Sequence, residues 1–154
     1  MPAPKRVLFI CGGNTCRSPM AKAILSHMLT HSQIKEPVIV ESAAYGAPTA
    51  PGASRGAKLA IMRILGQDAL ANHHAKRVTA GLLDSADVIL VMTHGMKKAL
   101  PPLKTWTLKE YVGETGDIPD PWGKTTETYV ECAEEIRRCL ELALPKIIRQ
   151  LNLK

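Results

Sequence analysis

The sequence predicts an α/β fold with three layers, in which helices flank a four-stranded parallel sheet. Short apolar runs alternate with longer segments of helical periodicity, and 154 residues are enough to bury one core with nothing to suggest a second. We therefore expect one domain over residues 1–154. A glycine-bearing loop after the first strand should then lie at the carboxyl edge of the sheet, where such folds bind ligands.

The first strand, helix and strand predict a right-handed unit with parallel strands. Residues 7–10 are short, branched and aromatic, which is typical of a buried strand. A helix is expected next, because Ser18 suits the N-cap, Pro19 suits the first helical position, and apolar residues then recur at helical spacing. Residues 38–43 predict the second strand, parallel to the first.

Expected helices and strands follow one another in the rest of the chain as well. Gly66 marks a helix end, and Thr79 should cap a short turn of helix. Pro145 should kink the last helix or end its regular hydrogen bonding. The expected elements are helices at 55–65, 95–100 and 129–151, an interior strand at 88–92, and a fourth strand at 104–108.

The loop between the first strand and the first helix carries the chemistry. Gly12 and Gly13 let the backbone curl and Asn14 tolerates a left-handed conformation, so the loop amides can converge on an anion. Cys11 opens this loop, and Arg17 follows six residues later. The loop dipoles and Arg17 should stabilise Cys11 as a thiolate nucleophile. The planar guanidinium can hold two phosphoryl oxygens.

The pattern Cys-x5-Arg-Ser, with Asn14 and the following Ser-Pro-Met-Ala, resembles the low-molecular-weight protein tyrosine phosphatase family. The resemblance implies a phosphocysteine intermediate on Cys11. It also implies that a late Asp-Pro-aromatic supplies the general acid, which here is Asp120 rather than the nearby Asp117. The catalytic residues are then Cys11, Arg17 and Asp120, and the substrate-binding residues are Gly12, Gly13, Asn14, Thr15, Cys16, Ser18 and Trp122.

Thr15 stands where tyrosine phosphatases of this family commonly carry an Ile or another bulky apolar residue. With Met-Thr-His at 92–94 and Thr-Leu-Lys-Glu-Tyr-Val at 107–112, the chain looks like the bacterial protein-arginine phosphatase branch. A threonine leaves room and a hydroxyl for a phosphoguanidinium, on which Trp122 could stack. The expected function is hydrolysis of phosphoarginine in proteins. The alternative is a tyrosine phosphatase in which Thr15 is a neutral variant.

Two further residues match the family pattern. Ser42 resembles the serine of a Ser-Ala-Gly stretch that supports the loop asparagine, although an ordinary strand-end hydroxyl is an equal alternative. Ala44 replaces the glycine of that stretch, which could strain the turn. His73 occupies the place of a family histidine, but we favour a packing or surface histidine there.

Cysteine usage favours a reducing compartment, the cytoplasm. The chain has four cysteines, two of them in the loop described above, which is not typical of a secreted disulfide framework, and we do not expect its first residues to form a signal peptide. Cys132 and Cys139 are seven residues apart on the last helix, too far for a disulfide, and should pack in the core. Oxidation could join Cys11 to Cys16 in a reversible off state.

Charge and composition restrict the classes of partner, cofactor and function that we expect. The net charge of +6 favours phosphorylated proteins, but the basic residues are scattered without an aromatic platform, so we expect neither nucleic acid nor membrane as a partner. We expect a monomer with no metal or organic cofactor, because the five histidines repeat no ligand spacing. An arsenate reductase is disfavoured because residues 93–100 contain no cysteine. A non-catalytic phosphate-binding module would need neither the thiol nor the acid.

Overall fold

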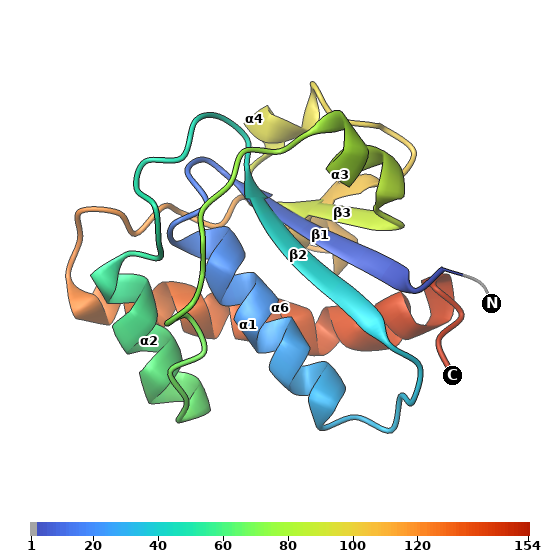
Figure 1. The fold of residues 1–154 in the computed structure, drawn as a ribbon, viewed down its shortest axis with the longest axis horizontal. Coiled ribbons are helices and arrows are strands. Elements are labelled where there is room, and N and C mark those ends of the chain that lie inside the picture. The colour runs from blue at the N-terminus through green and yellow to red at the C-terminus, as the bar shows by residue number, and fades with distance from the viewer. Residues whose placement is uncertain (1–2) are drawn as a thin grey trace.

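A computed structural model describes residues 3–154 and contains a four-stranded sheet with helices on both faces (Figure 1). The strand order is β2-β1-β3-β4, and every neighbouring pair is parallel. The predicted fold class is therefore confirmed. The strands are β1 Lys5–Cys11, β2 Val38–Ala44, β3 Val88–Val91 and β4 Thr105–Thr107.

The helices form two outer layers (Figure 1). The larger layer packs on one face of the sheet and contains α1 Arg17–Thr30, α2 Arg55–Leu65, α5 Leu108–Tyr111 and α6 Thr126–Gln150. The smaller layer covers the other face with α3 Ala80–Ser85 and α4 His94–Lys97. Because both faces are covered, the central strands are shielded from water, as in other parallel sheets.

β1 shows how the sheet separates the two cores. Val7 and Phe9 belong to the core beneath α1 and α6, whereas Leu8 and Ile10 belong to the core beneath α3. This alternation is the two-residue period of a strand. All four side chains are at most 1% exposed, so β1 is a rigid platform that ends at Cys11.

Several element boundaries agree with the sequence and others differ for physical reasons. α2 ends at Gly66 in the left-handed conformation, and Thr79 accepts a hydrogen bond from the amide of Leu82 at the start of α3, both as predicted. The expectation that Ser18 is the N-cap of the first helix is wrong. α1 already begins at Arg17, and the Ser18 hydroxyl is engaged by the preceding loop.

α5 was not expected, and a capping box explains it. The Thr107 hydroxyl accepts from the amide of Glu110, and the Glu110 carboxylate accepts from the amide of Thr107. Of the two effects expected of Pro145, it does not end the last helix, because α6 continues to Gln150. A kink at Pro145 stays a prediction.

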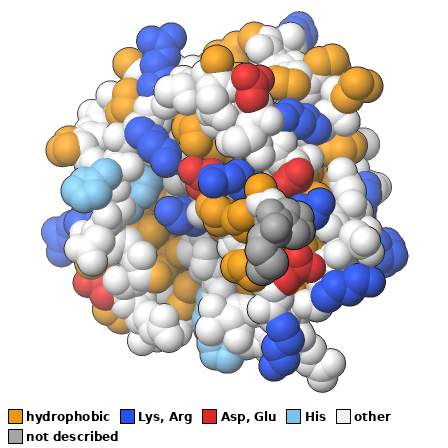
Figure 2. Space-filling view, turned by 45° about the vertical axis from the view of Figure 1, so that its right-hand side comes forward, with side chains coloured by type: hydrophobic (Ala, Val, Ile, Leu, Met, Phe, Trp, Pro, Cys, Tyr) orange, Lys and Arg blue, Asp and Glu red, His pale blue; other side chains and the backbone are white. Residues whose placement is uncertain are grey.

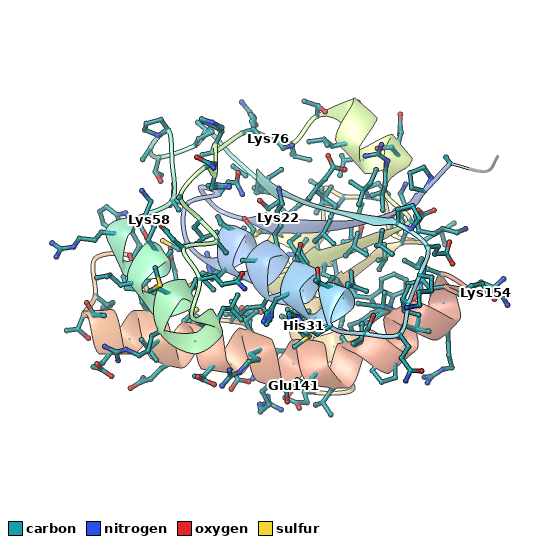
Figure 3. All side chains as sticks on the ribbon, turned by 60° about the horizontal axis from the view of Figure 1, so that its bottom comes forward. Lys22, His31, Lys58, Lys76, Glu141 and Lys154 are labelled. Atoms are coloured by element: carbon teal, nitrogen blue, oxygen red, sulfur yellow. The ribbon has the colours of Figure 1, made fainter. Side chains whose placement is uncertain are left out.

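The buried apolar stripe of α6 faces α1 and α2, which lie above it in Figure 3. Cys132 and Cys139 belong to this stripe, and burial raises the pKa of their thiols to about 12 and about 11, respectively. Gly56 of α2 has no room for a side chain, because a Cβ there would enter the ring of Tyr129. The backbone of α2 therefore packs closely against the side chains of α6.

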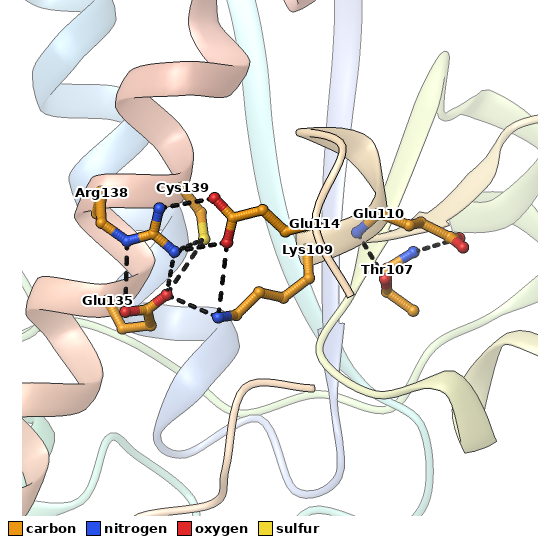
Figure 4. A network of polar contacts seen from close by, with 7 residues as sticks. All are labelled: Thr107, Lys109, Glu110, Glu114, Glu135, Arg138 and Cys139. Carbon is orange, nitrogen blue, oxygen red and sulfur yellow. Dashed lines mark hydrogen bonds and ion pairs between the residues drawn. The ribbon is translucent and has the colours of Figure 1, made fainter. Parts of the chain in front are cut away.

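A polar network ties α5 to α6 (Figure 4). Arg138 makes two hydrogen bonds of 2.7 Å to Glu114 and also binds Glu135, and Lys109 bonds Glu135 at 2.8 Å. These cations lower the pKa of Glu135 to about 2. Two carboxylates and two cations thus neutralise one another beside Cys139.

The molecular surface carries mixed charge. In the face drawn in Figure 2, Lys and Arg side chains are dispersed and interleaved with Asp and Glu rather than gathered in one stripe. Within residues 3–154 no helix has the length and apolar character that crossing a membrane requires.

Candidate active site

Asn14 holds the loop between β1 and α1 in shape. Its backbone adopts the left-handed conformation, with φ of 59°, as the sequence predicted. Its buried side-chain nitrogen donates to the hydroxyls of Ser18 at 2.8 Å and Ser42 at 3.0 Å, and its side-chain oxygen accepts from the amide of Lys76 at 3.0 Å. The expected support from Ser42 is therefore present. The loop is fixed from behind by groups far apart in the chain.

The loop carbonyls point outward. The carbonyl of Cys11 accepts from the amide of Tyr45 at 2.7 Å, and that of Thr15 accepts from the amide of Ser54 at 2.9 Å. Within the described chain, the amides of residues 13–16 have no protein acceptor. Amides left free on the concave side of a curled loop form an anion site, here next to the N-terminus of α1.

His73 also holds the loop, which the sequence analysis did not expect. Its Nε2 lies 2.7 Å from the carbonyl oxygen of Asn14, and because a carbonyl can only accept, Nε2 must carry the proton. Half-burial lowers the pKa of His73 below 6.5, although the hydrogen bond to Asn14 opposes that shift. The favoured interpretation as a packing or surface histidine is therefore wrong.

Ala44 does not strain the turn after β2. Among residues 3–154, the non-glycine residues with positive φ are Asn14 and Asn152. Ala44 instead exchanges backbone hydrogen bonds with Lys76 and Val78, at 2.7 Å and 2.9 Å.

Cys11 lies at the base of the loop and is 2% exposed. Its sulfur is 3.3 Å from the amide nitrogen of Ser18 and 2.9 Å from the Ser18 hydroxyl. Both groups can donate to the sulfur when it carries negative charge as an attacking or leaving thiolate.

Arg17 is buried, and one edge of its guanidinium makes no hydrogen bond to the described part of the protein. Nη1 donates to the carbonyl of Ile118 at 2.8 Å, Nη2 lies 3.7 Å from a carboxylate oxygen of Asp120, and Nε is buried without a partner. An unsatisfied buried donor is costly unless a ligand completes it. The Nε–Nη2 edge is the edge that binds two oxygens of an anion in a bidentate manner.

The segment after α5 brings Asp120 to the loop. The amide of Ile118 donates to the carbonyl of Met92 at 2.9 Å, at the end of β3. Asp117 accepts from the amide of His94 at 2.9 Å, so it is engaged at the start of α4 and does not line the cleft. The Asp120 carboxylate accepts from the amide of Trp122 at 3.0 Å and is 55% exposed, so it remains accessible to a substrate.

These groups enclose a cleft of about 260 Å³. The cleft is lined by Cys11, Gly13, Thr15, Cys16, Arg17, Thr49, Asp120 and Trp122. Of the residues predicted to bind substrate, Asn14 and Ser18 lie fully buried behind the loop, and Gly12 lies beside the Arg17 guanidinium. Thr49 was missed because it lies in a loop of Gly, Pro and Ala that matches no motif.

Cys16 is a separate thiol on the cleft wall. Its sulfur lies 3.3 Å from the Ser54 hydroxyl and 3.6 Å from that of Tyr129, whereas the sulfur of Cys11 is engaged by Ser18. Both cysteines are free. A disulfide between them stays a prediction.

Comparisons with known proteins identify the family to which the chain is similar. A family model described as low molecular weight phosphotyrosine protein phosphatase matches residues 6–153. The protein-arginine-phosphatase of Bacillus subtilis (strain 168) is 33% identical over 153 residues, which cover 95% of this chain and 96% of that protein. The low molecular weight protein-tyrosine-phosphatase PtpB of Staphylococcus aureus is 31% identical over 141 residues, covering 85% and 91%.

Solved structures show the same similarity. A structure of the YwlE arginine phosphatase, in a mutant with a phosphorylated active-site serine, superposes with a TM-score of 0.83 at 32% identity. The match covers 92% of this chain and 95% of that one.

His73 predicts a pH dependence of stability. Because its pKa is lower in the folded chain than in the unfolded chain, its contribution is complete above about pH 6.5 and is lost as the pH falls through the folded value. We expect urea unfolding between about pH 8 and about pH 5 to show this loss. His73→Gln keeps an N–H donor without titrating, so its stability should fall less over the same range. An equal fall in both proteins would contradict the assignment.

Proposed function

The chain belongs to the low-molecular-weight phosphotyrosine protein phosphatase family, and on that premise we propose that it hydrolyses phosphoarginine residues of proteins through a phosphocysteine intermediate. Family membership makes it a phosphatase, and its relatives include arginine and tyrosine phosphatases. The observation that carries the proposal is one cleft in which Cys11, the open edge of Arg17 and Asp120 meet beside the hydroxyl of Thr15. The geometry supports each step as follows.

Substrate binding uses the anion site of the loop. Two phosphoryl oxygens take the Nε–Nη2 edge of Arg17, and the free amides of residues 13–16 bind the oxygens that remain. The phosphorus is then held above the sulfur of Cys11. The donors are fixed before the substrate arrives, so little reorganisation is needed as charge shifts in the transition state.

The first chemical step transfers the phosphoryl group to Cys11. The thiolate attacks phosphorus, an S–P bond forms, and the bond from phosphorus to the guanidine nitrogen breaks. Asp120 donates a proton to the departing nitrogen, so that arginine leaves with its guanidinium restored. Cys11 and Asp120 line the same cleft, which supports these two roles.

The second step regenerates the enzyme. Asp120, now ionised, accepts a proton from a water molecule that attacks the phosphocysteine. The S–P bond breaks, inorganic phosphate leaves, and the two donors from Ser18 stabilise the returning thiolate. The phosphorylated serine in the arginine phosphatase mutant supports a covalent intermediate of this kind.

Thr15 favours a phosphoguanidine over an aryl phosphate. A phosphoguanidine is planar but polar, and its N–H groups need acceptors in the cleft. The hydroxyl of Thr15 and the carboxylate of Asp120 are acceptors on the cleft walls, and the exposed ring of Trp122 offers a stacking surface. An aryl ring would gain nothing from the hydroxyl.

Phosphotyrosine hydrolysis is the second candidate, and Trp122 is the observation that favours it. Its side chain is 64% exposed at the cleft, and an aromatic wall also suits a phenyl ring. Thr15 favours phosphoarginine of the two, because a bulky apolar residue at this position would close the space and remove the acceptor. Four free thiols also support the cytoplasm as the place where either substrate is met.

Substitution of Thr15 tests the specificity. We expect the wild-type chain to have a kcat/KM for a phosphoarginine peptide roughly tenfold or more above that for a matched phosphotyrosine peptide. Thr15→Ile should reverse this order because it removes an acceptor and fills the cleft. Thr15→Ser, which keeps the hydroxyl, should retain the wild-type order. Equal turnover of both peptides by the wild-type chain would remove the claim.

Two aspartates on the same segment provide a matched test of the acid. Asp120→Asn should lower kcat on phosphoarginine by about 10²- to 10⁴-fold, because the amide cannot protonate the leaving nitrogen. The loss should be smaller for p-nitrophenyl phosphate, whose leaving group needs less protonation. Asp117→Asn should stay within about tenfold of wild type. A larger loss in Asp117→Asn than in Asp120→Asn would reassign the acid.

A further inference from the structure

We propose that Thr49 is a positioning residue for substrate choice, which orients the Thr15 hydroxyl so that its lone pairs face the nitrogen side of a phosphoguanidine. This inference rests on the proposed function and deepens it. It is based on the contact between the hydroxyls of Thr15 and Thr49, which lie on two different loops and belong to no common sequence motif.

The loop that carries Thr49 is fastened to the catalytic loop on both sides. Before Thr49, the amides of Tyr45 and Gly46 donate to the carbonyls of Cys11 and Gly12, at 2.7 Å and 3.3 Å. After it, the amide of Ser54 donates to the carbonyl of Thr15 at 2.9 Å, as described above. Although Thr49 is exposed, these hydrogen bonds on both sides of it fix its position relative to the cleft.

Gly13 makes room for Thr49. A Cβ at position 13 would lie 2.8 Å from the Thr49 hydroxyl oxygen and 3.0 Å from its methyl carbon. The φ of Gly13 is not positive, so a turn does not require glycine there. The lack of a side chain lets Thr49 lie across the catalytic loop and line the cleft.

The Thr15 hydroxyl has two neighbours that can accept its proton. The Thr49 hydroxyl oxygen lies 3.3 Å away, and the Cys16 sulfur lies 3.6 Å away. Sulfur is the weaker acceptor, so the oxygen of Thr49 is the preferred one. Thr15 is 4% exposed, which leaves little water to compete for this proton.

The direction of this proton matters for one substrate class. When Thr15 donates to Thr49, its lone pairs are free to accept an N–H from the guanidine nitrogens of the substrate. If Thr49 cannot accept, the Thr15 proton can turn into the cleft, where it would oppose that N–H. An aryl phosphate has no N–H at the bridging atom, so it is indifferent to the orientation.

The test uses the full chain and compares kcat/KM for a phosphoarginine peptide with that for p-nitrophenyl phosphate. Thr49→Val keeps the shape and removes the acceptor, and should lower the ratio of the two values by roughly three- to tenfold. Thr49→Ser keeps the hydroxyl and should retain the wild-type ratio to within about twofold. In a Thr15→Val background, Thr49→Val should have no further effect on the ratio, because the partner hydroxyl is gone.

Two results would overturn the inference. Thr49→Val could leave the ratio unchanged, and an equal fall in both values would then indicate loop packing alone. Thr49→Val could also act additively with Thr15→Val. Failure of the proposed function is distinguishable, because it would already show in the wild-type chain as no preference for phosphoarginine over phosphotyrosine, and the inference would fall with it.

Discussion

The catalytic loop depends on the buried side chain of Asn14. Three of its hydrogen bonds reach Ser18, Ser42 and Lys76, and a fourth bond joins its carbonyl to His73. The partners come from α1, β2 and the loop between α2 and α3, so the left-handed turn is stabilised by elements that the fold brings together. In a dry environment, a network satisfied at every member rigidifies the site, whereas a missing member is costly. The turn directs carbonyls outward and leaves amides for an anion.

Arg17 then connects this loop to the segment that carries the acid. One guanidinium nitrogen bonds the carbonyl of Ile118, and the opposite edge stays open toward the cleft. Arg17 therefore joins the loop that contains Cys11 to the segment that carries Asp120, and in the proposed mechanism its open edge binds the phosphoryl group. Ile118 is fastened in turn to Met92 at the end of β3. Parallel strands end at one edge of the sheet, which is why groups so distant in sequence meet there.

The fold could be predicted, and candidate reacting groups could be proposed, because the sequence signals for both are local. Apolar strands, the stop at Gly66 and the Cys-x5-Arg pattern each lie within a few residues. The supporting residues could not be predicted, because their roles come from tertiary contacts. The role of His73 depends on its hydrogen bond to a carbonyl 59 positions earlier. The role of Thr49 depends on the space that a glycine on another loop leaves for it. Ser18 is a residue type that is common at helix N-caps. Its hydroxyl instead contacts the buried sulfur of Cys11 and the side-chain amide of Asn14.

The central claim is that the loop amides and the open edge of Arg17 form a cradle for one phosphoryl group between Cys11 and Asp120. A crystal structure with orthovanadate, which imitates the phosphoryl group in transfer, tests this most directly. The account predicts vanadium bonded to the Cys11 sulfur, Nε and Nη2 of Arg17 each on one oxygen, and the Asp120 carboxylate at the apical oxygen. Vanadate bound elsewhere, or bound at Cys11 with Nε still unpartnered and Asp120 turned away, would contradict it.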